Sequence, residues 1–188
     1  MKYFNKRISR AVMMLLALSL AGCANPLNKT TYYRYLEAGA TAEKQADAAT
    51  AEIAYSRALG NVYMGNLGPE REAEALFNLG RLERLNGKLQ QSLEHLLKSL
   101  EIDESKNNAK PEIIKSTLGE IAKTCYEMKA YEKGVIYLER LHAMGLDSFR
   151  SPQSKRFIHD IFSEYAEILD DLGMADKADK FRNASPPR

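Results

Sequence analysis

The feature that most constrains this chain is a repeat of slightly more than forty residues. Three prolines that are each followed by Glu or Gln, namely Pro69, Pro111 and Pro152, lie 42 and 41 residues apart. Proline suits the first turn of a helix, where its missing N–H is not needed, so each of the three is expected to begin a helix. A period of this length predicts a stack of similar helical units.

Small residues follow the same period in two series that are 12 positions apart. Two antiparallel helices that join at a tight turn need a small side chain on each helix where the axes come closest. Turn signals such as Asn86-Gly87 and Leu172-Gly173 fall between the two series, so each unit is predicted to be a helical hairpin. The first series is Gly39, Gly80, Ala122 and Ala166, the second is Ala51, Ser92, Gly134 and Ala178, and the turn positions between them are Ala46, Gly87, Lys129 and Gly173.

Larger apolar residues are expected to fill the space around these close contacts. Beyond residue 31 the pattern is helical throughout, with no alternation of apolar and polar residues that would indicate a strand. The fold class is therefore all-α. Arg182 stands where the last unit should carry an apolar residue, which fits a terminal unit with a more polar face. The core series is Tyr35, Leu76, Leu118 and Phe162 on the first helices and Tyr55, Leu96 and Leu138 on the second.

The run Ala75-Leu-Phe-Asn-Leu-Gly80, with Leu85-Asn-Gly87, Ser92-Leu93 and Ser99-Leu100 after it, resembles a tetratricopeptide repeat (TPR). Residues 121–141 are similar to it, and the first and last units resemble it more weakly. The resemblance implies a right-handed α-solenoid of four TPR-like helix-turn-helix units over residues 32–185. The usual repeat has about 34 residues, so the extra residues here are expected in longer helices or in connectors at 60–68, 105–110 and 145–151. An unrelated antiparallel helical bundle is the alternative.

The N-terminus has the layout of an export signal. Residues 1–22 hold four basic residues and no acid, and the apolar run at 11–21 is about half of what a membrane-spanning helix needs. Leu20-Ala21-Gly22-Cys23 resembles the lipobox of bacterial lipoproteins. That resemblance implies cleavage between Gly22 and Cys23, a diacylglycerol thioether on Cys23, and acylation of the new amino terminus by a fatty acid such as palmitate.

The resemblance also implies a location. Ala24 follows the cysteine where many inner-membrane lipoproteins carry Asp, which favours the periplasmic face of the outer membrane. Several acyl chains together give stable attachment, whereas one chain gives only reversible binding. Residues 23–31 are expected to be a lipidated linker and 186–188 a C-terminal tail. An ordinary cleaved signal, with Cys23 there by coincidence, is the alternative.

The remaining cysteine, Cys125, has no partner for a disulfide if Cys23 carries lipid. Its neighbours on the helical face are apolar, so a small buried side chain is favoured over a reactive thiol. The tyrosines pose a similar choice. Tyr32, Tyr33 and Tyr35 are expected to divide between core packing and half-exposed positions, with a contact surface beside the membrane as the alternative.

Several classes of function find no support in the residues. Without residues 1–22 the chain carries 23 basic and 25 acidic residues, so no basic surface for nucleic acid is expected. His95, His142 and His159 have no metal-ligand spacing, no Gly-x-Ser-x-Gly motif occurs, and the adjacent acids Asp170-Asp171 diverge on a helix. We therefore predict neither an enzyme nor a protein with a metal, cofactor or small-molecule substrate.

The TPR resemblance implies binding of proteins or peptides on the surface formed by the first helices. Its groove positions fall on Phe77, Arg81, Arg84, Lys123 and Tyr126, which could receive an extended or acidic segment of another envelope protein. Tyr33, Leu36, Glu167 and Asp170 occupy similar positions in the outer units. The alternative is a solvated surface in which Arg81 and Arg84 pair with the nearby Glu74 and Glu83.

Two functions remain open from the sequence. The first is an adaptor that recruits or positions envelope proteins at the outer membrane, either as a pilotin-like escort of secretin subunits or as a docking protein for cell-wall hydrolases. The second is a constitutive structural subunit of a larger envelope or secretion complex. Reversible, salt-sensitive binding would favour the adaptor, and co-purification at fixed stoichiometry would favour the structural subunit.

Overall fold

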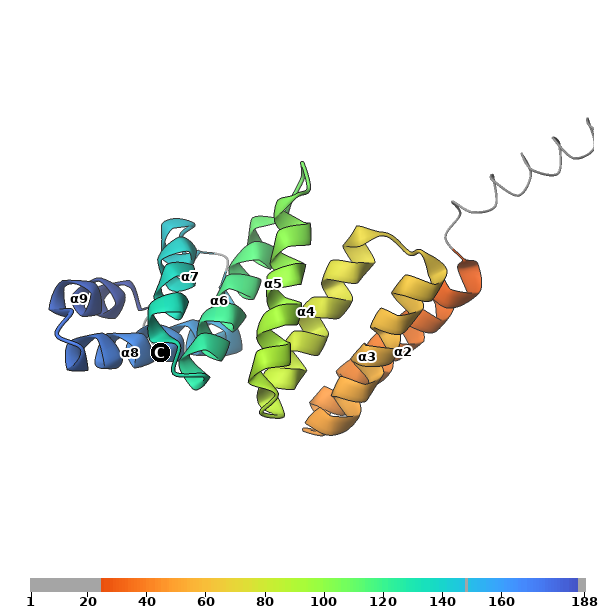
Figure 1. The fold of residues 1–188 in the computed structure, drawn as a ribbon, viewed down its shortest axis with the longest axis horizontal. Coiled ribbons are helices and arrows are strands. Elements are labelled where there is room, and N and C mark those ends of the chain that lie inside the picture. Colours follow the sequence, from red (N-terminus) through yellow and green to blue (C-terminus); the bar gives the residue numbers. More distant parts are fainter. Residues whose placement is uncertain (1–24, 148, 186–188) are drawn as a thin grey trace, which may run out of the picture.

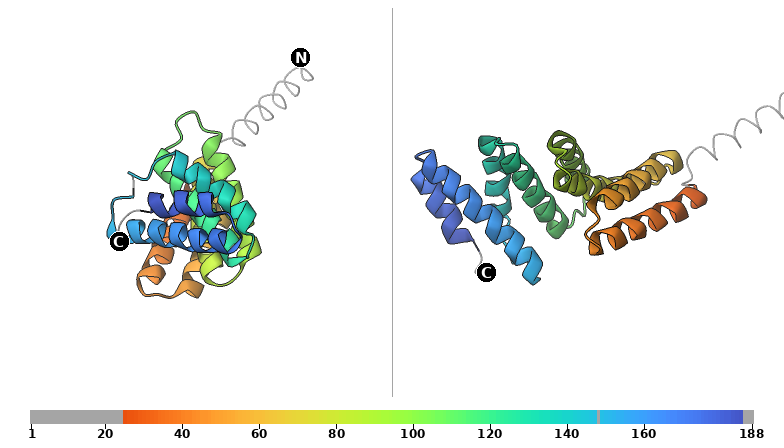
Figure 2. Two further views of the ribbon diagram at one scale, coloured as in Figure 1. Left: turned by 90° about the vertical axis from the view of Figure 1, so that its left-hand side faces the viewer. Right: turned by 90° about the horizontal axis from the view of Figure 1, so that it is seen from below.

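The computed structural model describes residues 25–147 and 149–185, and this part of the chain forms eight α-helices and no strand. They form four consecutive antiparallel hairpins that follow one another along a single long axis (Figure 1). The two further views in Figure 2 show the same row of hairpins from its end and from below. The predicted all-α solenoid is therefore confirmed, and the compact bundle is not observed. The hairpins are α2 (Pro26–Lys44) with α3 (Ala48–Gly65), α4 (Pro69–Leu85) with α5 (Leu89–Glu104), α6 (Pro111–Glu127) with α7 (Tyr131–Ala143), and α8 (Pro152–Asp171) with α9 (Ala175–Ala184).

Each hairpin turns at the position that the repeat predicts. Ala46, Gly87, Lys129 and Gly173 all have positive φ, at 57°, 76°, 59° and 73°. At each turn the following N–H reaches back to a carbonyl five residues earlier, as from Lys88 to Glu83 at 2.8 Å, which is the hydrogen bond of a Schellman helix end. Glycine adopts this conformation readily, whereas a residue with a Cβ is disfavoured by about 1–2 kcal/mol. The turns at Ala46 and Lys129 are therefore strained relative to the other two.

A proline begins the first helix of every hairpin. Pro69, Pro111 and Pro152 confirm the prediction, and Pro26 begins α2 in the same way. The prediction that residues 26–31 belong to a linker is wrong. Asn25 caps the new helix with its side chain, which accepts a hydrogen bond from the N–H of Leu27 at 3.0 Å. The capping residue Asn25 is two positions after Cys23 in the sequence, and the first helix begins at the next residue. Cys23 itself lies outside the described residues, as do the predicted signal peptide, cleavage site and C-terminal tail.

The two series of small residues are buried at the contacts between paired helices, as predicted. A Cβ added to Gly39 would lie 2.6 Å from the ring of Tyr55 on the partner helix, and one added to Gly80 would lie 2.8 Å from Leu96. Gly134 of α7 is the tightest of these positions, since an added Cβ would lie 3.0 Å from Cys125 on the paired helix α6 and would overlap the hydroxyl of Tyr165 from α8. Small side chains therefore set the distance between the helices, as the repeat indicated.

The extra length of the repeats lies mainly in the helices. Residues 60–65 were predicted as the start of a connector, but they continue α3, and only 66–68 join it to α4. The connectors at 105–110 and 144–151 are longer, as expected. In the last unit the apolar position is shifted by one residue. Phe181 is buried against Phe162 with ring centroids 5.6 Å apart, while Arg182 is exposed and pairs with Asp170 and Asp179.

The interior of the stack consists of two apolar clusters. One is formed by α2, α3 and α4, and the other extends from α5 to α9. Polar contacts accompany them, including a hydrogen bond from the Ser99 hydroxyl to the Ala73 carbonyl at 2.9 Å. Cys125 is fully buried in the second cluster, where burial raises the pKa of its thiol, so it is the small core residue that the sequence favoured. None of the helices described is both long and apolar enough to cross a membrane.

Candidate interaction surface

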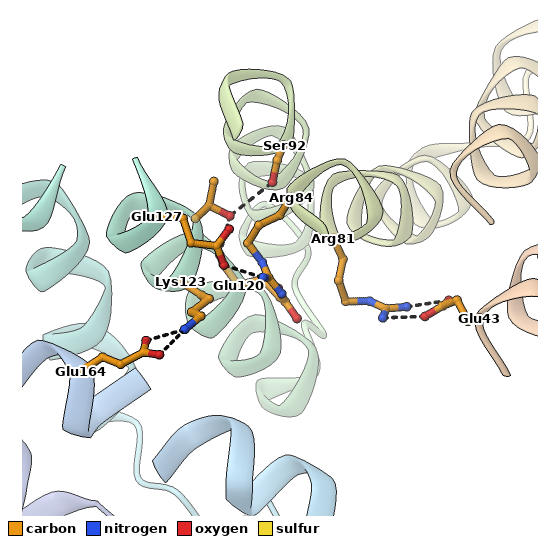
Figure 3. Close-up of polar contacts among 9 residues, drawn as sticks. Glu43, Arg81, Arg84, Ser92, Glu120, Lys123, Glu127 and Glu164 are labelled. Carbon is orange, nitrogen blue, oxygen red and sulfur yellow. Dashed lines mark hydrogen bonds and ion pairs between the residues drawn. The ribbon is translucent and has the colours of Figure 1, made fainter. Parts of the chain in front are cut away.

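Ion pairs connect the first helices of successive hairpins (Figure 3). Arg81 of α4 pairs with Glu43 of α2 at N–O distances of 2.6 and 2.7 Å, and Lys123 of α6 pairs with Glu164 of α8. Burial acts to raise the pKa of Glu43, but hydrogen bonds from Arg81 and from the Tyr55 hydroxyl outweigh it and hold that pKa below its usual value. Each of these side chains therefore acts between units rather than within one helix.

Arg84 makes the most buried of these connections. One turn beyond Arg81 on α4, it reaches α6 and pairs with Glu120 at 3.1 Å and Glu127 at 2.7 Å. The side chains of Arg84 and Glu120 are only 10% and 9% exposed. Burial raises the pKa of Glu120, although the neighbouring Arg84 and Arg81 act to lower it. Glu120 is thus a buried carboxylate, and the guanidinium of Arg84 takes the place of the water that would otherwise stabilise its charge.

The alternative from the sequence, in which Arg81 and Arg84 pair with Glu74 and Glu83 nearby, is wrong about the partners. Glu74 accepts a hydrogen bond from the Tyr32 hydroxyl at 2.6 Å, and Glu83 contacts His95 at 2.7 Å. The actual partners lie 36 to 43 residues away along the chain, which is close to one repeat length. A search for opposite charges one repeat apart, instead of three or four residues apart, would have found them.

Tyr126 belongs to a cluster of aromatic rings on the same side of α6. Its ring makes edge contacts with Tyr131 and Tyr165, each at a centroid distance of 5.6 Å, and the ammonium of Lys123 lies 5.2 Å from its centre. The Tyr165 hydroxyl donates to the Ala122 carbonyl at 2.7 Å inside the stack. The tyrosines thus divide between core and half-exposed positions, as the sequence favoured, with Tyr32 fully buried.

A groove runs across the N-terminal halves of α4, α6 and α8. Its larger part, about 810 Å³, lies between α4, the 105–110 connector and α6, and its smaller part, about 400 Å³, lies between α6 and the start of α8. Phe77, Glu112 and Ser116 line both parts, so the two adjoin. Of the five residues that the sequence singled out, Phe77 is the one that lines this groove. Arg81, Arg84, Lys123 and Tyr126 lie further along the same helices.

Aromatic side chains line much of the smaller part of the groove. Phe77 comes from α4, while Phe149 and Phe157 come from the connector and from α8. Phe157 lies over Gly119, where an added Cβ would be 3.1 Å from the ring. Gly119 occupies the position in the third unit that Phe77 occupies in the second, three residues before the buried small residue. A ring from the next unit therefore fills the space that a side chain of α6 would otherwise take.

The charged residues in the smaller part of the groove are acidic. Glu112 and Glu120 line the smaller part, and none of the described residues that line it is basic. Arg84 neutralises Glu120, but among the described residues Glu112 has no ion pair. The larger part carries both signs, with Lys106 bound to Asp103 at 2.7 Å. This combination of aromatic surface and a carboxylate without an ion pair suits a bound segment that carries an apolar side chain next to a basic one.

The positions predicted in the outer units do not extend the groove. Tyr33 accepts hydrogen bonds from the Arg71 guanidinium, which also lies 5.7 Å from its ring centre, and Asp170 pairs with Arg182. Leu36 packs partly buried against the first cluster, and Glu167 is exposed. Within residues 25–147 and 149–185, no group of three or more His, Cys, Asp or Glu side chains could hold a metal ion.

Comparison with solved structures supports the fold. The chain is similar to the crystal structure of the TPR-like repeats of a kinesin light chain-type protein from Podospora anserina, with a TM-score of 0.61, 16% sequence identity, and coverage of 82% of this chain and 72% of that one. A variant of the same fungal protein, with one glutamine replaced by methionine, matches equally well, with a TM-score of 0.61, 16% identity and coverage of 81% and 71%. No protein-family model and no curated protein matches the sequence. The described helices therefore form a TPR-like solenoid.

Proposed function

We propose that this protein is a protein-interaction scaffold, tethered to the outer membrane through lipid on Cys23 and facing the periplasm, that positions other envelope proteins. The TPR-like fold supports the role of scaffold, because stacked helical hairpins present extended surfaces that bind polypeptides. The lipobox-like run Leu20-Ala21-Gly22-Cys23 supports the tether. The observation that carries the interaction role is the aromatic and acidic groove across α4, α6 and α8.

The groove best fits an extended segment of a partner that carries an apolar side chain beside Lys or Arg. Phe77 and Phe157 offer flat rings to an apolar group, and aromatic residues often dominate the energetics of such contacts. Glu112 lies between the two parts of the groove, where it can meet a basic side chain. The sequence-based proposal of an acidic segment bound by Arg81, Arg84, Lys123 and Tyr126 is the competing version, and in it each cation would have to exchange its present carboxylate for the partner.

A photo-cross-linking amino acid identifies the partner and tests the groove. We expect the probe to capture a partner in the native host when it replaces Ile113, which lines the groove and is 42% exposed. A probe at Ile136 on α7, which is 58% exposed, is the control and should capture much less. Equal capture at both positions would contradict the groove as the binding site. The identity of the captured chain then distinguishes a pilotin-like role from a hydrolase adaptor.

The affinity for that partner separates the two versions of the site. Ser116→Arg places a large side chain in both parts of the groove and should weaken binding at least about tenfold, whereas Ser56→Arg on the exposed face of α3 should not. Lys123→Met should leave binding unchanged if the groove is the site. A large loss with Lys123→Met and none with Ser116→Arg would favour the cationic version instead.

The tether has its own test. We expect a fatty-acid probe to label the wild-type chain in cells and the chain to fractionate with outer membranes. The Cys23→Ser variant should lose both properties, since the sulfur is the site of the thioether. Labelling that persists in Cys23→Ser would contradict the lipoprotein proposal, while leaving the groove experiments unaffected.

A further inference from the structure

The end of the solenoid nearest Cys23 carries an unusual set of exposed apolar side chains. Leu27 at the start of α2 and Met64 at the end of α3 are each 72% exposed, and no other large apolar side chain in the described part is as exposed. Tyr63, next to Met64, is 52% exposed. We refer to Leu27, Tyr63 and Met64 as the tether end.

Backbone contacts hold these residues at one end of the molecule. The N–H of Asn25 donates to the carbonyl of Gly65 at 2.9 Å, which fixes the start of α2 beside the end of α3. Asn28 packs so closely on Gly65 that an added Cβ there would lie 2.6 Å from it. Figure 1 shows the start of α2 and the end of α3 at the same extremity of the stack. The apolar side chains therefore sit where the described chain begins.

Covalent geometry limits how far this end can be from Cys23. Asn25 is two residues further along the chain, and an extended chain spans at most about 3.6 Å per residue, or about 7 Å in total. The headgroup region on each side of a bilayer is about 5–7 Å thick. A chain whose Cys23 sulfur carries lipid therefore has no linker that could lift Asn25 well clear of the membrane surface.

We propose that the tether end rests in the lipid headgroup region of the membrane that holds Cys23, as a second, non-covalent contact. This inference depends on the proposed lipidation of Cys23. Leu27 and Met64 would place their side chains at the boundary with the acyl chains. Tyr63 suits the interface because its ring is apolar and its hydroxyl is polar, and that hydroxyl already bonds Glu72 and Lys98, each at 3.1 Å.

This contact would orient the scaffold. The groove begins at Leu67, three residues beyond Met64, and its larger part includes the first turn of α4. A partner in the groove would then bind close to the membrane surface at that end. The last hairpin, at the opposite end of the row in Figure 1, would extend away from the bilayer.

The test uses the lipidated full-length protein, purified from host membranes and reconstituted into vesicles of phosphatidylethanolamine and phosphatidylglycerol. An environment-sensitive fluorophore is attached to Met64→Cys, and in a matched variant to Ile136→Cys on α7, which is 58% exposed. Cys125 is fully buried and should not label in the folded protein. We expect the emission at position 64 to rise about threefold or more on vesicles and to be quenched by nitroxide-labelled lipid. The emission at position 136 should do neither.

Each outcome decides between distinct possibilities. If the protein floats with the vesicles but the two positions respond alike, the tether end does not contact lipid and the inference is wrong while the tether stands. If the wild-type protein does not float, the lipid tether fails and the inference fails with it. If the emission at position 64 rises with protein concentration in detergent and ignores the lipid quencher, a second copy of the chain covers this end instead.

Discussion

Removing the guanidinium of Arg84 is the sharpest test of how the hairpins are held together. In Arg84→Met the aliphatic part of the side chain is kept and the charge is lost. Glu120, which is 9% exposed in the wild type, then loses its direct ion pair and keeps only Arg81 as a nearby cation, while Glu127, which is 30% exposed, can still be hydrated. Most of the effect should therefore come from the buried carboxylate.

The size of the effect follows from these exposures. Deleting one partner of a buried ion pair costs about 3–5 kcal/mol. The lower end applies here, because Glu127 can regain water and Glu120 can escape part of the penalty by binding a proton. We expect Arg84→Met to lower the free energy of unfolding by about 3 kcal/mol at pH 7.5.

The loss should depend on pH in a defined direction. Burial raises the pKa of Glu120 in the folded protein, and without Arg84 that pKa must rise further. A carboxyl group with a raised folded pKa favours folding below its unfolded pKa, and this contribution disappears as the pH rises through the folded value. The deficit of the variant relative to wild type should therefore be small near pH 5 and larger at pH 7.5.

Urea unfolding followed by helical circular dichroism measures both quantities. Arg34→Met is a matched control, because Arg34 is exposed on α2 and makes no ion pair with the described residues, so it should change stability by less than about 0.5 kcal/mol. Glu120→Gln in the Arg84→Met background should restore part of the loss at pH 7.5. A cost below about 1 kcal/mol with no dependence on pH would refute the reasoning, since it would mean that Glu120 is hydrated.

Three further predictions concern the packing of the hairpins. Gly134→Ala should lower the free energy of unfolding by about 2–3 kcal/mol, because the added Cβ would overlap Tyr165. Gly60→Ala in α3 is the control: an added Cβ there has nothing within 4 Å, so it should raise the free energy of unfolding by about 0.5–1 kcal/mol. Equal effects of the two changes in urea unfolding would contradict the close contact at Gly134. Lys129→Gly should raise the free energy of unfolding by about 1 kcal/mol, because glycine adopts the φ of 59° at this turn without strain. Gly87→Ala should lower the free energy of unfolding by a similar amount. A Lys129→Gly variant that is less stable than wild type would be inconsistent with a strained turn. Cys125 should resist a thiol reagent in the folded protein and react only in step with unfolding in urea, and prompt labelling would show that its burial is incomplete.

Much of the fold could be predicted from the sequence because its determinants repeat. A proline at the start of a helix, a small residue where two helix axes meet and a tight turn with positive φ are local features, and each recurs about every 42 residues. The exceptions come from the ends. Residues 24–31 were assigned to a linker because they are polar and carry Pro26 and two Asn, although Pro26 begins α2. In the last described unit the buried position is Phe181 and not Arg182.

Less of the candidate site could be predicted, because its contacts join units rather than neighbours in sequence. Arg81 and Arg84 were predicted as groove positions of the repeat, but their partners depend on how adjacent hairpins are rotated, which no local pattern encodes. Phe77 was identified because it occupies a groove position of the repeat. Phe149 and Phe157 were not, since they reach the groove from a connector and from the next unit.

The groove itself arises from a departure from the repeat. If α6 carried a side chain at position 119 as large as Phe77 is in α4, that side chain would collide with Phe157, and α8 would have to move away from α6. Gly119 lets Phe157 lie against the backbone of α6, so aromatic side chains from α4 and from α8 line the same part of the groove. The repeating residues therefore build a scaffold that many sequences could share. The non-repeating residues on the same helix faces, Phe77, Gly119 and Glu112 among them, give this scaffold the surface that we expect a partner to recognise.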